Sequence, residues 1–227
     1  MRQAKKEGRY LIMDNSLHEL GTPYNEDRLL YWLGELEPNE FIVPDIWEET
    51  DQSYQKAYYW KDHILYYPKT TFVAVIQARN LIDAGNLYRA YKHLGYEKIA
   101  FSYGADYYVK LIPHYHPTTA RALGRLKVIV DLCNQEIIDI EDKIHLLGCN
   151  LPQEFLWYKN IPQIESIDTS NPIMAAIGGI KYEDYGLLFK PKTKIDEVIN
   201  KIFDRDTIEL INYNINKFRL INGLNTK

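Results

Sequence analysis

The chain has 227 residues, of which 46% are apolar, so it holds enough apolar material for one globular domain of ordinary size. Its formal net charge of −4 excludes a general attraction to polyanions, so nucleic-acid binding would need a local basic patch. Two cysteines, Cys133 and Cys149, are too few for a disulfide framework or a metal cluster, and no apolar run reaches the ~18 residues of a membrane span.

Short apolar segments predict six β-strands. In chain order they are Tyr10–Met13, Glu40–Val43, Thr71–Ile76, Lys98–Ser102, Ile144–Leu147 and Glu165–Ile167. Segments this short and this apolar are typical of parallel strands that are covered on both faces. The segment YGLLFK, residues 185–190, is a candidate seventh strand.

Helical patterns lie between these strands. They are NEDRLLYWLGEL (25–36), NLIDAGNLYRAYKHLG (80–95), TTARALGRLKVIVDLCNQ (118–135) and PQEFLWYKNI (152–161). Gly95 is a good C-terminal cap, and Pro152 suits a first helical turn. A further helical pattern covers about 192–227, where we expect a helix that covers the barrel or forms a dimer face.

The alternation of strands and helices predicts a parallel sheet with crossover helices. Ligands of such folds bind at the carboxyl ends of the strands. A complete eight-stranded barrel usually needs ~250 residues. We therefore expect one α/β domain over residues 1–227 with a TIM-barrel-like (β/α) fold that is compact or incomplete, and an open sheet is the alternative.

Polar residues follow the predicted strands in the segments MDNSLHE, VPDIW, AVIQ, IAFSYGA, HLLGC and SIDTS. In this order the segments resemble the tRNA-guanine transglycosylase superfamily. Within it they are most similar to the branch that puts 7-deazaguanine bases into DNA, which is found in phages and bacterial genomic islands. The resemblance covers about Tyr10 to Ala176, and it is carried by the six segments together, since none of them is specific alone.

The resemblance implies roles for individual residues. Asp14 matches the family's general base, and Asp168 matches its nucleophile. Asp45 matches the acid that reads the Watson–Crick edge of the purine, and Gln77 matches a glutamine that binds the base. The strand end that lines the base pocket corresponds to Ser102, Tyr103 and Gly104.

The chain also departs from the family pattern. Ser16 and Leu17 stand where relatives usually have glycines, and Ala78 replaces the glycine after Gln77, so the pocket is narrower or fits another base. The tRNA enzymes have a zinc site of three cysteines and one histidine, which nothing after Cys149 supplies. Its absence favours the shorter DNA-modifying branch. Relatives have earlier strands before the first acidic motif, and this also predicts an incomplete barrel.

The implied chemistry suits these residue types. Base exchange breaks the N-glycosidic bond through an oxocarbenium-like transition state, which a carboxylate near C1′ stabilises or captures. A second carboxyl moves protons to and from the purine. Asp168 and Asp14 fit these two roles, and Asp45 with Gln77 offers acceptors and a donor to guanine. Taken alone, Asp14 or Asp168 also fits a helix N-cap or a loop hydrogen bond.

Basic residues recur at helical spacing after a pair of histidines. Arg121 and Arg125 fit a helix start that contacts nucleic-acid phosphates, and they also fit a solvated helix face. His114 and His116 have no third and fourth ligand at a suitable spacing, so we expect no metal. Glu19 fits either a partner of Asp14 or a helix-start acid.

The resemblance thus implies an enzyme that flips a guanine out of duplex DNA and exchanges it for a free 7-deazaguanine base through a covalent Asp168 intermediate, without a cofactor. The alternatives are a tRNA-guanine transglycosylase, a hydrolytic glycosylase, a non-catalytic partner subunit, and an unrelated barrel enzyme for a small metabolite. We expect DNA rather than tRNA as partner and no membrane, and the resemblance suggests a homodimer. The basic N-terminus lacks the apolar stretch of a signal peptide, so the expected location is the cytoplasm, that of the host cell if the chain is phage-encoded.

Overall fold

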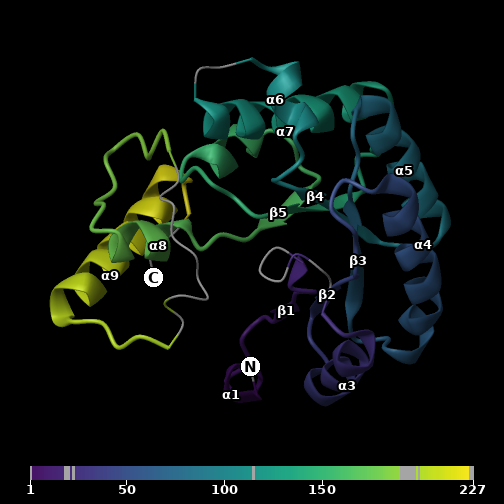
Figure 1. Ribbon diagram of the computed structural model, residues 1–227, viewed down its shortest axis with the longest axis horizontal. Coiled ribbons are helices and arrows are strands. Elements are labelled where there is room, and N and C mark those ends of the chain that lie inside the picture. Colours follow the sequence, from purple (N-terminus) through teal and green to yellow (C-terminus); the bar gives the residue numbers. More distant parts are fainter. Residues whose placement is uncertain are drawn as a thin grey trace.

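The computed structural model describes residues 2–17, 21, 24–113, 116–189, 198 and 200–224. Six parallel strands form one sheet in the order β1-β2-β3-β4-β5-β6. They are β1 (Ile12–Met13), β2 (Glu40–Ile42), β3 (Thr71–Ile76), β4 (Lys98–Ser102), β5 (Lys143–Leu147) and β6 (Ile164–Ile167). The sheet curls into a half-barrel (Figure 1), which confirms the predicted α/β class and the incomplete barrel-like arrangement.

Four helices cover the convex face of the curled sheet (Figure 1). They are α3 (Glu26–Leu36), α4 (Thr50–Trp60), α5 (Leu81–His93) and α7 (Pro117–Asn134). Asn25 and Asn80 cap α3 and α5, because each side chain accepts a hydrogen bond from a backbone N–H three residues later. Gly95 follows α5 with a φ of +91°, which is the left-handed conformation expected of a glycine at a helix end.

The core lies between the sheet and these helices, because side chains alternate between the two faces of each strand. In β2, Phe41 packs outward against Trp60 of α4, with ring centroids 5.1 Å apart, and Ile42 faces the inside of the curl. Ile42 joins a small inner cluster with Val73, Val75 and Ala100. Burial of each large apolar side chain contributes about 1.5–3 kcal/mol, so the outer layer supplies most of the stability.

Shorter elements complete the described structure. They are α1 (Arg2–Lys6), the 3₁₀ helix η1 (Lys61–Tyr66), α6 (Tyr107–Leu111), the 3₁₀ helix η2 (Glu154–Tyr158), α8 (Asn171–Ile177) and α9 (Arg205–Ile221). Helices α8 and α9 pack together beside the β6 edge (Figure 1). Asn214 of α9 is fully buried, and its side chain accepts from the Tyr182 N–H and donates to Pro172 and Ile180 carbonyls.

Three predicted elements differ from the structure. The segment 152–161 forms only the short 3₁₀ helix η2, after a turn at Pro152. Residues 187–189 form no strand, and the neighbouring Glu183–Gly186 contact is an isolated antiparallel bridge. The C-terminal helix begins only at Arg205, because the Asp204 side chain caps it by accepting from the Thr207 N–H. Ile202, inside the predicted helical segment, is 100% exposed and lies outside the observed helix.

Part of the predicted tail, residues 192–197, 199 and 225–227, lies outside the described residues, as do Glu19 and His114. Among the helices that the structure describes, none is long and apolar enough to cross a membrane.

Candidate active site at the carboxyl ends of the strands

The carboxyl ends of all six strands meet at one edge of the half-barrel, here called the rim. Its residues are Asp14, Asn15, Asp45, Gln77, Ser102, Tyr103, Gly104, Gly148, Cys149 and Asp168. Parallel pairing of every strand with the next makes this convergence unavoidable. The structure therefore brings the predicted site residues, apart from Arg121 and Arg125, to the same edge.

Asp45 and Gln77 are in direct contact. Gln77 Nε2 donates to Asp45 Oδ2 across 2.6 Å, and Asn15 Nδ2 donates to Asp45 Oδ1 across 2.6 Å. The Asn15 amide also donates to the Val43 carbonyl, and Gln77 Oε1 accepts from the Glu48 N–H at 3.1 Å. All three polar side chains are almost fully buried, so the ends of β1, β2 and β3 are joined by a closed set of hydrogen bonds.

Burial raises the pKa of Asp45 to about 6, although the hydrogen bonds from Gln77 and Asn15 act to lower it. The negative charge of nearby Asp14 raises it further. Asp14 itself is exposed, and its Oδ2 accepts from the Ser16 N–H at 3.1 Å. A carboxyl with a pKa near 6 gains and loses a proton close to neutral pH, which suits a general acid or base.

Backbone strain is present beside this set. Ser16 and Glu48 both have positive φ values, of 62° and 51°, which cost free energy for residues other than glycine. The conformation of Glu48 directs its N–H to Gln77, and its carboxylate accepts from the Asp106 N–H across 2.5 Å. The loop after β2 is therefore held in one conformation by contacts with the ends of β3 and β4.

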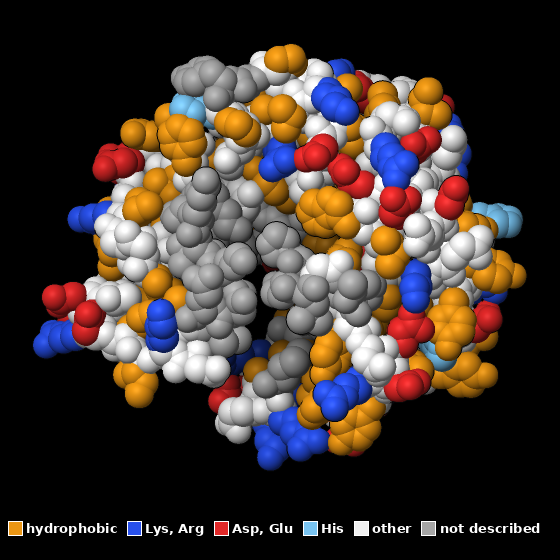
Figure 2. Space-filling view, in the orientation of Figure 1, with side chains coloured by type: hydrophobic (Ala, Val, Ile, Leu, Met, Phe, Trp, Pro, Cys, Tyr) orange, Lys and Arg blue, Asp and Glu red, His pale blue; other side chains and the backbone are white. Residues whose placement is uncertain are grey.

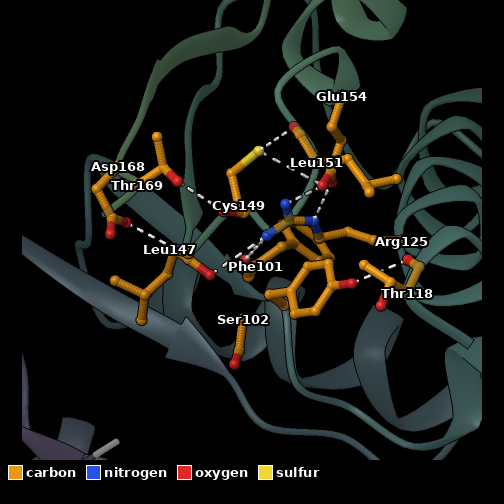
Figure 3. Close-up of polar contacts among 12 residues, drawn as sticks. Phe101, Ser102, Thr118, Arg125, Leu147, Cys149, Leu151, Glu154, Asp168 and Thr169 are labelled. Carbon is orange, nitrogen blue, oxygen red and sulfur yellow. Dashed lines mark hydrogen bonds and ion pairs between the residues drawn. The ribbon is translucent and has the colours of Figure 1, made fainter. Parts of the chain in front are cut away.

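Asp168 has a different environment. Its Oδ1 accepts from the Gly148 N–H at 2.7 Å and lies 3.2 Å from His145 Nε2 (Figure 3 shows Asp168 beside Leu147 and Thr169). Its side chain is 51% exposed. Partial burial acts to raise the pKa of Asp168, but the contact with His145 and the Gly148 N–H outweigh it, so the pKa lies below its usual range.

The second carboxylate oxygen of Asp168 differs from the first. Within the part of the chain that the structure describes, Oδ2 has no hydrogen-bond partner. Gly148 adopts a φ of +73°, a conformation that L-residues avoid, and so directs its N–H to Oδ1. Asp168 is thus an ionised carboxylate with one oxygen held and the other available at the rim.

The end of β4 lies against an aromatic ring. A Cβ at Gly104 would lie 1.8 Å from Trp47 Cη2, so only glycine permits the observed contact. Trp47 is 40% exposed at the rim. Tyr103 points elsewhere, because its hydroxyl donates to the Thr118 carbonyl at 2.8 Å. Ser102 Oγ accepts a long hydrogen bond, 3.4 Å, from the Gly104 N–H.

Arg125 lies in the core instead of facing a ligand. Its guanidinium is fully buried, pairs with Glu154 at 2.5 Å, and donates to the Phe101 and Leu147 carbonyls (Figure 3). This placement leaves no exposed surface with which it could contact a phosphate. Arg121 is partly exposed and pairs with Asp106 across 2.5 Å. The predicted pair of phosphate-contacting arginines is therefore not presented together on one surface.

Cys149 sits beside this ion pair. Its thiol donates to the Leu151 carbonyl at 3.0 Å and lies 3.6 Å from Glu154 Oε2. Burial and the Glu154 charge raise the pKa of Cys149 well above its ordinary value, so the group stays a thiol. It is a packed structural group, not a nucleophile.

The two acids with predicted catalytic roles stand at opposite edges of the sheet. Asp14 follows β1 and Asp168 follows β6, with four strands between them in the sheet order. Two cavities near the rim, of about 460 and 220 Å³, are lined by neither acid. The larger lies between α3 and α4 and includes Ile46, and the smaller lies at the starts of α4 and α5 and includes Arg79.

Charges of both signs are interspersed over the face shown in Figure 2, and a group of basic side chains gathers at its lower end, over α1. Among the described residues, no group of three or more His, Cys, Asp or Glu could hold a metal ion. Comparison with known proteins assigns no family, since no family model and no curated protein matches the sequence. Functional inference therefore rests on the rim itself.

Three rim-related residues were missed as site candidates by the sequence reasoning. Asn15 and Trp47 lie within the quoted segments MDNSLHE and VPDIW, directly beside residues that were selected. His145 lies inside the predicted strand 144–147, and a buried histidine in an apolar strand was a usable signal. Its contact with Asp168 depends on the pairing of β5 with β6, which the sequence alone did not give.

Proposed function

We propose that this chain acts on the N-glycosidic bond of a guanine nucleotide in DNA and exchanges the base for a 7-deazaguanine. The observation that carries the proposal is the contrast between two acids of one rim. Asp168 is held ionised, with its pKa below the usual range, whereas the pKa of Asp45 is raised to about 6. Carboxyls with divergent pKa values are the usual arrangement for glycosidic chemistry, in which one acid stays charged and another exchanges a proton.

In this proposal Asp168 Oδ2 approaches C1′ and captures the oxocarbenium-like centre as guanine leaves. The bond from C1′ to the purine nitrogen breaks, its electron pair goes to the base, and a C1′–O bond to Asp168 forms. Attack by the incoming 7-deazaguanine nitrogen reverses these changes and frees the carboxylate. Gly148 supports this role because its N–H holds Oδ1 and leaves Oδ2 available.

The other rim residues recognise the base and move its proton. Asp14 is exposed beside Asp45, and the two interact electrostatically, so a proton on one affects the other. Asp45 and Gln77 present a carboxylate and an amide that match the donors and acceptor of a guanine edge. A base that binds Asp45 and Gln77 takes the place of hydrogen-bond partners that these two side chains now have within the protein.

The test is release of radiolabelled guanine from duplex DNA, with and without a free 7-deazaguanine base. Label lost only when the free base is present supports exchange, and Asp168→Asn abolishes the loss. Asp62→Asn is the matched control, since Asp62 is an exposed acid of η1, far from the rim along β3, and it leaves exchange intact. Loss of label without added base, together with abasic sites in the DNA, shows that the enzyme hydrolyses the bond and does not exchange the base. No loss from DNA or tRNA contradicts the proposal.

A second candidate is a base-exchanging or hydrolysing enzyme for a free nucleoside. The placement of the arginines favours it, because Arg125 is buried while Arg121 and Arg79 pair with acidic neighbours. A polyanionic partner needs available positive charge. Parallel assays with free deoxyguanosine separate the candidates, since only the nucleoside enzyme releases guanine from it faster than from DNA and does so independently of salt.

A further inference from the structure

A line of polar side chains, of which Glu40, Lys98 and His145 are buried, crosses the inner face of the half-barrel and ends at Asp168. Lys98, at the start of β4, has an exposed fraction of only 1%. Its ammonium group contacts Glu40 at 2.6 Å, Glu165 at 2.8 Å and Ser166 Oγ at 2.8 Å. The ammonium donates hydrogen bonds to Glu40 and Ser166 and forms an ion pair with Glu165.

The next two members lie side by side in the sheet. His145 of β5 pairs in register with Ala100 on one side and Ser166 on the other. The small side chain of Ala100 leaves room for the imidazole on the inner face. His145 Nδ1 lies 2.9 Å from Ser166 Oγ, and Nε2 lies 3.2 Å from Asp168 Oδ1. His145 is fully buried, so its ring has no alternative partner in solvent.

The direction of each hydrogen bond follows from the ammonium group. Lys98 has only donors, so Ser166 Oγ must accept from it. The Ser166 hydroxyl keeps its own proton to donate, and among the described residues the acceptor within hydrogen-bond distance is His145 Nδ1. That donation leaves Nδ1 as an acceptor and puts the imidazole proton on Nε2, which lies 3.2 Å from the carboxylate oxygen Oδ1 of Asp168.

We propose that Lys98 and Ser166 impose the Nε2–H tautomer on His145, and that His145 thereby acts as a positioning residue that holds one oxygen of Asp168. The role of Asp168 in catalysis rests on the proposed function. The tautomer of His145 does not, because it is a property of the protein without substrate. The charged groups along this line are Glu40 of β2, Lys98 of β4 and Glu165 of β6. Lys143 of β5 lies 3.9 Å from the Glu165 carboxylate, and the Tyr10 hydroxyl donates to Glu40.

The test uses ¹⁵N-histidine NMR at neutral pH, with the His145 signals assigned by their loss in His145→Gln. We expect protonated Nε2 and unprotonated Nδ1 in the natural protein. Asp168 also favours this tautomer, so the decisive variant is Asp168→Ala, which removes that influence. If Ser166 imposes the tautomer, Asp168→Ala keeps the single Nε2–H form.

Matched second substitutions in the Asp168→Ala chain then isolate the hydroxyl. Ser166→Thr keeps the hydroxyl and the single tautomer, whereas the isosteric Ser166→Val yields both tautomers. Thr70→Val, which removes a buried hydroxyl that donates to the Pro38 carbonyl, changes nothing at His145. Unchanged signals from the other histidines report an intact fold. An Nδ1–H form in the natural protein, mixed tautomers in Asp168→Ala, or a single form with Ser166→Val each overturns the inference. Absence of base exchange overturns only the proposed function.

Discussion

Gln77 and Asp45 join the ends of β3 and β2 through a 2.6 Å hydrogen bond between an amide and a carboxylate that are both buried. The sequence pattern predicted that each of these residues binds a base, and it did not predict that they contact each other. Their mutual contact means that the site is organised before any ligand arrives, and that binding replaces internal hydrogen bonds.

This burial predicts a pH-dependent difference in stability between the natural protein and Asp45→Asn. The folded pKa of Asp45, about 6, lies above the unfolded value of 3.8, so between these values the folded chain retains a proton that the unfolded chain releases. The stabilising contribution of the proton is complete below about pH 4 and is lost as pH rises through 6. The loss amounts to about 3 kcal/mol.

Urea denaturation at intervals from pH 4 to pH 8 measures this effect. The free energy of unfolding of the natural protein, minus that of Asp45→Asn, falls across pH 4–6 and is flat above pH 7, because the other acids cancel in the difference. A difference that does not vary with pH contradicts the raised pKa.

Removal of the Arg125 guanidinium destabilises the fold strongly. Arg125→Met leaves the Glu154 carboxylate buried without its partner, which costs about 3–5 kcal/mol. Arg125→Met with Glu154→Leu recovers most of that loss, since no uncompensated charge remains. The exposed pair Arg205–Glu209 is the control, and Arg205→Met costs about 0.5 kcal/mol or less. Equal losses in the single and double variants, measured by urea denaturation, contradict the charge argument.

Gly148→Ala tests the backbone conformation that holds Asp168. The φ of +73° strains alanine by about 1–2 kcal/mol, while its Cβ would meet only an ordinary contact with Tyr103 at 3.5 Å. Gly95→Ala carries similar strain at a φ of +91° with no neighbour within 4 Å. We expect similar losses of stability by thermal denaturation, with lowered base exchange for Gly148→Ala alone. Equal rates of base exchange in both variants would contradict a role of Gly148 in holding Asp168.

Gly104→Ala displaces the Trp47 ring. The new Cβ would lie 1.8 Å from the ring, and such overpacking costs about 1–3 kcal/mol. A shift of tryptophan fluorescence reports the displacement, and the shift vanishes in a Trp47→Phe background. Gly34→Ala is the control: it lies within α3 with no neighbour within 4 Å, and it gains up to about 1 kcal/mol of stability without a spectral change.

The strands were predictable because apolar runs that end on polar residues have few alternative structures. Five of the six predicted strands both start and end within one residue of the observed ones, and the first is shortened to Ile12–Met13. Helix α4 was missed because its sequence, TDQSYQKAYYW, is polar and rich in tyrosine, and only Ser53, Ala57 and Trp60 are buried. Tertiary packing, rather than an apolar stripe, makes this segment a helix.

The site was predictable only as a list of strand ends. The positions of Asp14, Asp45, Gln77 and Asp168 at the rim follow from parallel topology. Their partners do not, because Asn15 reaches Asp45 through the loop after β1, and His145 reaches Asp168 through the register of β5 and β6. The burial of Arg125 was equally hidden, since helical spacing does not show which face of α7 meets the sheet.

The strand order has a consequence for how the protein is made. Each strand of the sheet pairs with the strand that precedes it in the chain, so a chain leaving the ribosome finds every partner already synthesised. The sheet can grow from β1 toward β6 without a strand waiting exposed for a distant partner. Lys98 meets Glu40 as soon as β4 is added, but Ser166 and Asp168 arrive only with and just after β6. The carboxylate at the centre of the proposed chemistry therefore acquires its environment only when the last strand of the sheet is in place.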